Sequence, residues 1–197
     1  MVIKIFDRTR SSKNRPAELP SLEDRQVLIS PQLNEEEKVL VKAFYQYQQD
    51  FFRQLHQDNT MFSDVWTELQ KRKDRIIDLP TLALQSFGAA LEFTRPSEID
   101  ENALDPQTFF AEGGRCMDAA YFTAAVIHRL YDLANCDFPG YTQLLLCRTQ
   151  VKNVSTGEKK SSYHAVVLLA DEREQIILDT LNAKKNLTCR FYAAKRL

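Results

Sequence analysis

The chain has 197 residues, of which 44% are hydrophobic and 27% charged, and its 26 Lys or Arg against 27 Asp or Glu leave a net charge of −1. This composition is typical of one globular domain and excludes a collagen or a wholly disordered chain. The balanced charge argues against nucleic acid as a partner, and no apolar run approaches the ~20 residues that a membrane helix needs.

The N-terminus lacks the apolar segment of a signal peptide, so we expect a soluble, cytoplasmic protein. The four cysteines show no CxxC spacing, which fits a reducing compartment. Residues 1–33 join a short apolar start to a polar stretch with two prolines, and they predict an extended arm. This arm suits an ordinary terminus, or a leader that secretes the protein as an effector into a host cell.

The first half of the domain is expected to be helical, over residues 34–93. Asn34 is placed as the N-cap of a first helix, and two more helices are expected over about 61–77 and 80–90. The apolar stripe of the first helix is Leu40, Phe44, Tyr47, Phe51 and Leu55. Residues 94–112 are rich in proline and acids and predict a connection.

The second half, over residues 113–193, combines one helix with strands. Residues 116–133 are apolar almost all round, which predicts a helix at the centre of the domain. Strands are expected over 142–151, 163–170 and 175–181, with a last one over 187–193. The chain is therefore predicted to form a single α+β domain over 34–197, with an antiparallel sheet.

A histidine and an aspartate lie on the predicted hairpin. If Ala170 and Gln175 flank a tight turn, facing residues sum to 345, so His164 and Asp179 are diagonal neighbours on one face of the sheet. The hairpin is otherwise apolar, and a buried carboxylate is costly unless it accepts a hydrogen bond, such as one from an imidazole. We therefore expect these two side chains to pair.

Cys116 follows two glycines and begins the central helix, whose free N–H groups and dipole stabilise a thiolate and an oxyanion. Cys116, His164 and Asp179 then supply a nucleophile, a base and an orienting group. His128 lies about 18 Å along the same helix, too far to act on Cys116. The other histidine and cysteines are expected to be structural: His56, Cys136, Cys147 and Cys189.

The segments GGRCMDAAYFTAAVIHRL, YHAVVLLA and QIILDTL resemble the transglutaminase-like superfamily of papain-like cysteine enzymes, over about residues 110–182. The resemblance implies a papain-like core in which Cys116 is the nucleophile, His164 the general base and Asp179 the residue that orients it. Met117 stands where a Trp is common in the family and Ala165 where an aromatic is, which argues against protein cross-linking.

These residues predict thiol-dependent hydrolysis of a peptide or glutamine carboxamide bond, by a cysteine protease or a protein glutamine deamidase like the bacterial effectors of this fold. Two alternatives stay open: acyl transfer, as by a transglutaminase or an arylamine N-acetyltransferase, and a binding module with an idle triad. Gln107 is a candidate oxyanion donor beside the Cys116 N–H. The expected partner is a protein or peptide substrate, with no cofactor and no metal ion.

Overall fold

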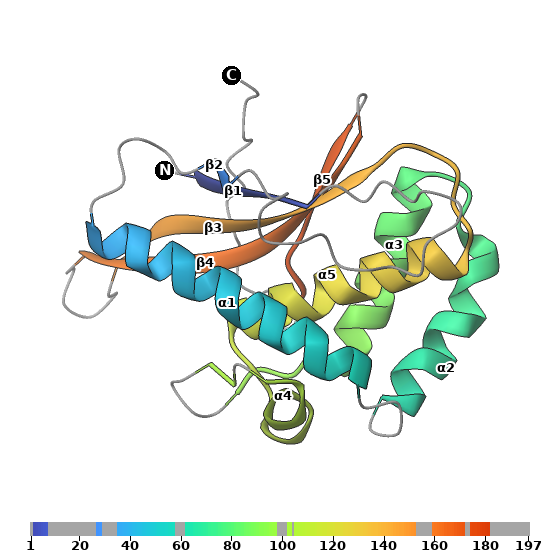
Figure 1. Cartoon of the computed structure of the whole chain (residues 1–197), viewed down its shortest axis with the longest axis horizontal. Coiled ribbons are helices and arrows are strands. Elements are labelled where there is room, and N and C mark those ends of the chain that lie inside the picture. Colours follow the sequence, from blue (N-terminus) through green and yellow to red (C-terminus); the bar gives the residue numbers. More distant parts are fainter. Residues whose placement is uncertain are drawn as a thin grey trace.

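The computed structural model describes residues 2–7, 27–28, 35–57, 62–97, 102–103, 105–152, 159–171 and 174–181. The helices are α1 (Glu35–Gln57), α2 (Ser63–Arg72), α3 (Leu79–Phe93), α4 (Pro106–Glu112) and α5 (Cys116–Leu133), with a 3-10 turn, η2, at Lys73–Arg75. The strands are β1 (Val2–Asp7), β2 (Val27–Leu28), β3 (Tyr141–Lys152), β4 (Lys159–Ala170) and β5 (Gln175–Leu178). The protein is an α+β protein (Figure 1).

The strands form one antiparallel sheet in the order β2-β1-β3-β4-β5. Two of them come from the segment expected to be an extended arm, 1–33: β1 pairs with β3 along its whole length, and β2 pairs with β1. The remainder of that segment, the predicted cap at Asn34 and the predicted strand at 187–193 lie outside the described residues.

The β4–β5 hairpin has the predicted register. Val167 faces Leu178 and Ala170 faces Gln175, so each facing pair sums to 345. Strand alternation then divides the apolar side chains of β4 between two clusters, one against α5 and one on the opposite face. Residues 165, 167 and 169 belong to the first cluster, and residues 166, 168 and 170 to the second.

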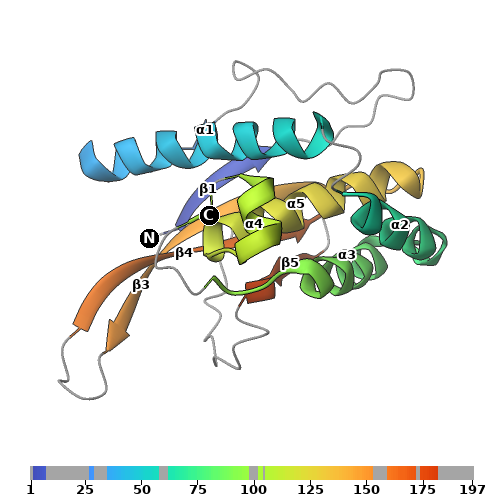
Figure 2. The ribbon, with the colours of Figure 1, turned by 90° about the horizontal axis from the view of Figure 1, so that it is seen from below.

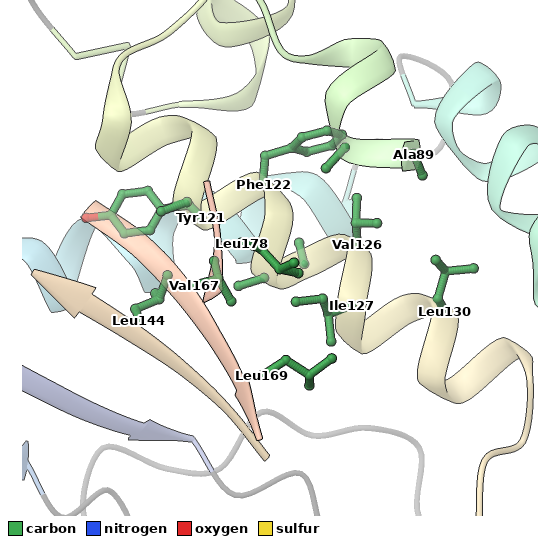
Figure 3. Close-up of a cluster of buried hydrophobic side chains, with 14 of the residues drawn as sticks. Ala89, Tyr121, Phe122, Val126, Ile127, Leu130, Leu144, Val167, Leu169 and Leu178 are labelled. Carbon is green, nitrogen blue, oxygen red and sulfur yellow. The ribbon is translucent and has the colours of Figure 1, made fainter. Parts of the chain in front are cut away.

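Helix α5 is the centre of the molecule, as its apolar sequence predicts. It packs on β3 and β4 and lies between α1 and α3 (Figure 2). Its residues Phe122, Val126 and Ile127 meet Val167 and Leu169 from the sheet in a fully buried core (Figure 3). Burial of one such side chain stabilises the fold by about 1.5–3 kcal/mol, so this contact holds α5 rigidly against the sheet.

Helix α4 corrects the prediction that residues 94–112 form a connection without regular structure. Asp105 caps it by accepting a hydrogen bond from the Thr108 N–H at 2.8 Å, and Pro106 occupies its first turn. Phe109 and Phe110 then pack their rings on Phe122 of α5, with centroids 5.3 and 5.2 Å away. A strong local cap and two aromatic contacts thus outweigh the polar composition of the segment.

Helix α1 covers the other side of α5. Phe44, Phe51 and Leu55 are buried as the predicted stripe requires, but Tyr47 is 37% exposed and Phe52 is buried instead. The buried face is therefore turned toward Phe52 relative to the prediction. Tyr121 of α5 ties the two helices together, because its hydroxyl donates a hydrogen bond of 2.7 Å to the Phe44 carbonyl.

Replacing Tyr121 with Phe is expected to lower the free energy of unfolding by about 1 kcal/mol, the net worth of one buried hydrogen bond. The ring stays in contact with Phe44, so the core keeps its packing. Urea unfolding followed by circular dichroism measures the change. Tyr47→Phe, at an exposed position of α1, is the control and is expected to change stability by only a few tenths of a kcal/mol. Equal stability of both variants would contradict the prediction.

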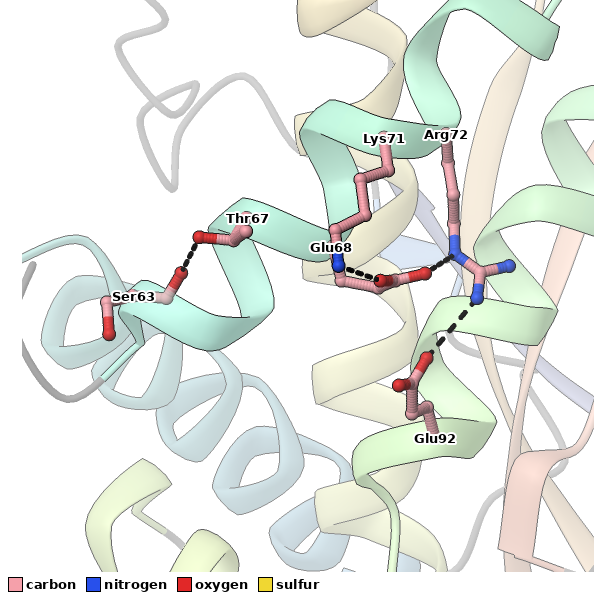
Figure 4. A network of polar contacts seen from close by, with 6 residues as sticks. All are labelled: Ser63, Thr67, Glu68, Lys71, Arg72 and Glu92. Atoms are coloured by element: carbon pink, nitrogen blue, oxygen red, sulfur yellow. Dashed lines mark hydrogen bonds and ion pairs between the residues drawn. The ribbon is translucent and has the colours of Figure 1, made fainter.

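Helices α2 and α3 are joined by a small ion-pair network (Figure 4). Arg72 of α2 bonds Glu68 of the same helix at 2.6 Å and Glu92 of α3 at 3.3 Å. Gly88 of α3 leaves room for this guanidinium, since a Cβ there would lie 2.7 Å from Arg72 Nη1. Among the helices described, none is long and apolar enough to span a membrane.

Candidate active site

The loop before α5 is shaped by two glycines. Gly113 has φ of 84° and ψ of −178°, a backbone conformation that is essentially restricted to glycine. Gly114 donates its N–H to the Arg95 carbonyl at 2.8 Å and accepts from the Ser97 N–H at 3.0 Å. A Cβ on Gly114 would lie 2.5 Å from the Phe109 ring. The chain can therefore turn sharply into α5 only with these residues.

Asp118, in the first turn of α5, holds this turn in place. Its buried carboxylate accepts hydrogen bonds from the Arg115 N–H at 2.9 Å and the Ala103 N–H at 3.0 Å. A carboxylate in the first turn also interacts favourably with the helix dipole. The sequence analysis did not single out Asp118, although an acid in the first turn of an otherwise apolar helix is a recognisable cap signal. The contact with Ala103 has no sequence signal.

Cys116 is the first residue of α5 and is partly buried. Its Sγ lies 3.9 Å from the Tyr163 carbonyl oxygen, and its thiol is within hydrogen-bonding reach of the His164 imidazole. The first N–H groups of a helix have no partner within the helix and carry a partial positive charge. The thiol therefore lies where both a thiolate and a developing oxyanion are stabilised.

His164 and Asp179 pair as the hairpin register predicts. Nε2 of His164 lies 2.7 Å from Oδ2 of Asp179, and the two side chains are only 20% and 6% exposed. Because Asp179 takes Nε2, the ring nitrogen left for Cys116 is Nδ1. The carboxylate thereby determines the tautomer and the orientation of the ring.

Burial alone would lower the pKa of His164, but the hydrogen bonds and negative charges of Asp179 and Cys116 outweigh it and raise that pKa to about 9. The imidazole is therefore mostly protonated at neutral pH. An imidazolium beside the sulfur favours the thiolate form, which is the nucleophilic form of cysteine.

The other candidate residues lie apart from this group. Gln107 is exposed in the first turn of α4, and within the described part of the chain no hydrogen bond joins it to Cys116 or His164, so its role as an oxyanion donor stays a prediction. His128 is partly buried, with its ring 6.2 Å from that of Phe52, as a packing residue. Cys136 is a free thiol whose burial, with nearby Asp137 and Asp132, raises its pKa to about 11. Cys189 lies outside the described residues.

Over the described ranges, no group of three or more His, Cys, Asp or Glu side chains is placed to hold a metal ion. A comparison of the chain with protein-family models, curated proteins and solved structures found no match. The case for a function therefore depends on the geometry of the site itself.

Proposed function

We propose that the protein is a cysteine hydrolase with Cys116 as nucleophile, His164 as general base and acid, and Asp179 as the residue that orients the imidazole. One observation supports this most: a single imidazole contacts both a buried carboxylate, at 2.7 Å, and a thiol at the start of a central helix. A nucleophile, a base and an orienting group in hydrogen-bonding sequence are the features shared by enzymes of this mechanism.

The finer assignment of the fold belongs to the same proposal. A central helix that begins with the nucleophile, packed on an antiparallel sheet that carries the base and its orienting group, is the arrangement of a papain-like, transglutaminase-like core. α5, β4 and the end of β5 have these relations. The proposed compartment is the cytoplasm or, for an effector, the cytoplasm of a host cell, where free thiols such as Cys116 and Cys136 persist.

In the acylation step, the Cys116 proton passes to Nδ1 of His164 and the sulfur attacks a peptide or carboxamide carbonyl. The oxyanion that forms is stabilised by the N–H groups at the start of α5. The C–N bond then breaks, and the imidazolium gives its proton to the departing amine or ammonia, leaving a thioester on Cys116. All protons are thus supplied by the thiol and returned through one ring.

In the second step, His164 takes a proton from water, the hydroxide attacks the thioester and the carboxylic acid leaves, which regenerates the Cys116 thiol. We propose water as acceptor, and therefore a cysteine protease or a protein glutamine deamidase acting on a protein or peptide. Transfer to an amine, as by a transglutaminase, or from acetyl-coenzyme A, as by an arylamine N-acetyltransferase, needs the same thioester and differs only in the acceptor or donor.

Alkylation by iodoacetamide tests the mechanism without knowledge of the substrate. At pH 7 we expect Cys116 to react at least about tenfold faster than Cys136, whose thiol is mostly protonated there, and His164→Ala to remove this advantage. Peptide mapping by mass spectrometry measures both rates in the same sample, so Cys136 is an internal control. Equal rates at the two cysteines, indifferent to His164, would mean that the triad is idle and the protein is a binding module.

The reaction type is then read from candidate substrate proteins by intact mass. Deamidation adds about one dalton, proteolysis divides the chain, and an added amine is incorporated only by a transferase. Each product must vanish in Cys116→Ala.

A further inference from the structure

The Asp179 carboxylate lies just beyond the part of β5 that the sheet holds. The last pair of the β4–β5 ladder is Val167 with Leu178, and Asp179 is the next residue. Strand pairing therefore does not determine the position of the carboxylate, although the 2.7 Å bond to His164 needs it within a few tenths of an ångström. A contact beyond the ladder has to hold this segment.

Thr180, the residue after Asp179, makes such a contact with α5. Its Oγ1 lies 3.1 Å from Oγ1 of Thr123, and the two side chains are 2% and 1% exposed. Thr123 also donates its own proton to the Ala119 carbonyl at 2.7 Å. Since the Thr123 proton is used there, Thr180 is the donor in the pair and Thr123 the acceptor.

This contact connects the orienting group to the helix that carries the nucleophile. Thr123 follows Cys116 by seven residues, which is about two helical turns and about 10 Å, so both lie on the same side of α5. The rigid packing of α5 on the sheet therefore positions the sulfur at one end and the Asp179 segment two turns further on.

We propose that Thr180, held by Thr123, is a positioning residue that keeps the Asp179 carboxylate on Nε2 of His164. Two adjacent residues thus have separate tasks: Asp179 contacts the imidazole and Thr180 holds Asp179 against α5. The role of this pair in catalysis rests on the proposed function, but its effect on His164 does not.

The test is the titration of His164, followed by NMR of the imidazole, in Thr180→Val and Thr123→Val. Valine keeps the shape and removes the hydroxyl, so we expect the pKa of His164 to fall from about 9 by about 1 in both variants. Thr180→Ser keeps the donor and is expected to titrate as the wild type. Thr142→Val, at another buried threonine, on β3, is the control and is expected to leave His164 unchanged.

A wild-type titration in both valine variants overturns the proposal, as does a serine variant that titrates like the valine variant. If Thr180→Val does not fold, Thr123→Val removes the same hydrogen bond from the helix side. These outcomes are independent of the proposed function, which fails on a different result: equal alkylation of Cys116 and Cys136. Where both hold, alkylation of Cys116 at pH 7 to 8 slows by about 3- to 10-fold in the valine variants.

Discussion

Asp179→Asn is expected to slow reaction at Cys116 by about 100-fold or more at neutral pH, the usual contribution of a general base and its orientation. The amide has the shape of the carboxylate but no charge, and it can present either an oxygen or an NH₂ group to Nε2 of His164. The ring therefore loses its determined tautomer and the charge that favours its protonated form. Alkylation rates and, once a substrate is known, turnover measure the effect.

The same substitution changes the dependence of both reactivity and stability on pH. Asp179 and Cys116 raise the pKa of His164 to about 9 in the folded protein, above its ordinary value near 6.5. A raised pKa means that the folded protein binds the proton more tightly than the unfolded chain. The stabilisation is therefore complete below about pH 6.5 and is lost as the pH rises through about 9.

Urea unfolding between pH 6 and pH 10 checks this sign. We expect the wild-type protein to lose stability over that window and Asp179→Asn to lose clearly less, because its imidazole titrates closer to the ordinary value. Asp74→Asn, at a side chain that is 82% exposed, is the control for removal of a carboxylate. If Asp179→Asn keeps the wild-type pH profile in both measurements, Asp179 does not orient His164.

Gly113→Ala is expected to lower the free energy of unfolding by about 2–4 kcal/mol and to impair the reactivity of Cys116 as well. The backbone of Gly113 lies in a region that other residues rarely enter, at a cost of about 1–3 kcal/mol. A Cβ there would also lie 2.8 Å from the Arg95 carbonyl oxygen and 2.9 Å from that of Pro96. Both obstacles are backbone atoms, which cannot move aside as a side chain can.

Gly88→Ala is the matched control. Its Cβ would approach only the end of the flexible Arg72 side chain, and alanine favours the helix in which Gly88 lies, so the net change in stability is expected to be small. Denaturation curves of the two variants, with the Cys116 alkylation rate, measure the difference. A Gly113→Ala protein within about 0.5 kcal/mol of the wild type would show that the loop accommodates a side chain.

The sequence by itself determined the elements whose signals are local. The continuous apolar character of residues 116–133 predicted α5 with the bounds observed, and the alternation of the hairpin with its tight turn predicted the register that brings His164 beside Asp179. Helical and strand periodicity arise from a few neighbouring residues, so a single sequence contains them. The proximity of Cys116 to this pair was expected only from its place at a helix start.

Other features depended on contacts between distant segments. Polar composition hid α4, which Asp105 caps and the Phe122 ring holds, and the buried face of α1 was decided by its packing on α5, which exposes Tyr47. The hydrogen bond between Thr123 and Thr180 joins residues 57 apart. Only the tertiary structure brings such residues together, because nothing in the local pattern of a threonine indicates which distant hydroxyl it will meet. The triad was thus readable from the chain, and the contact that positions it was not.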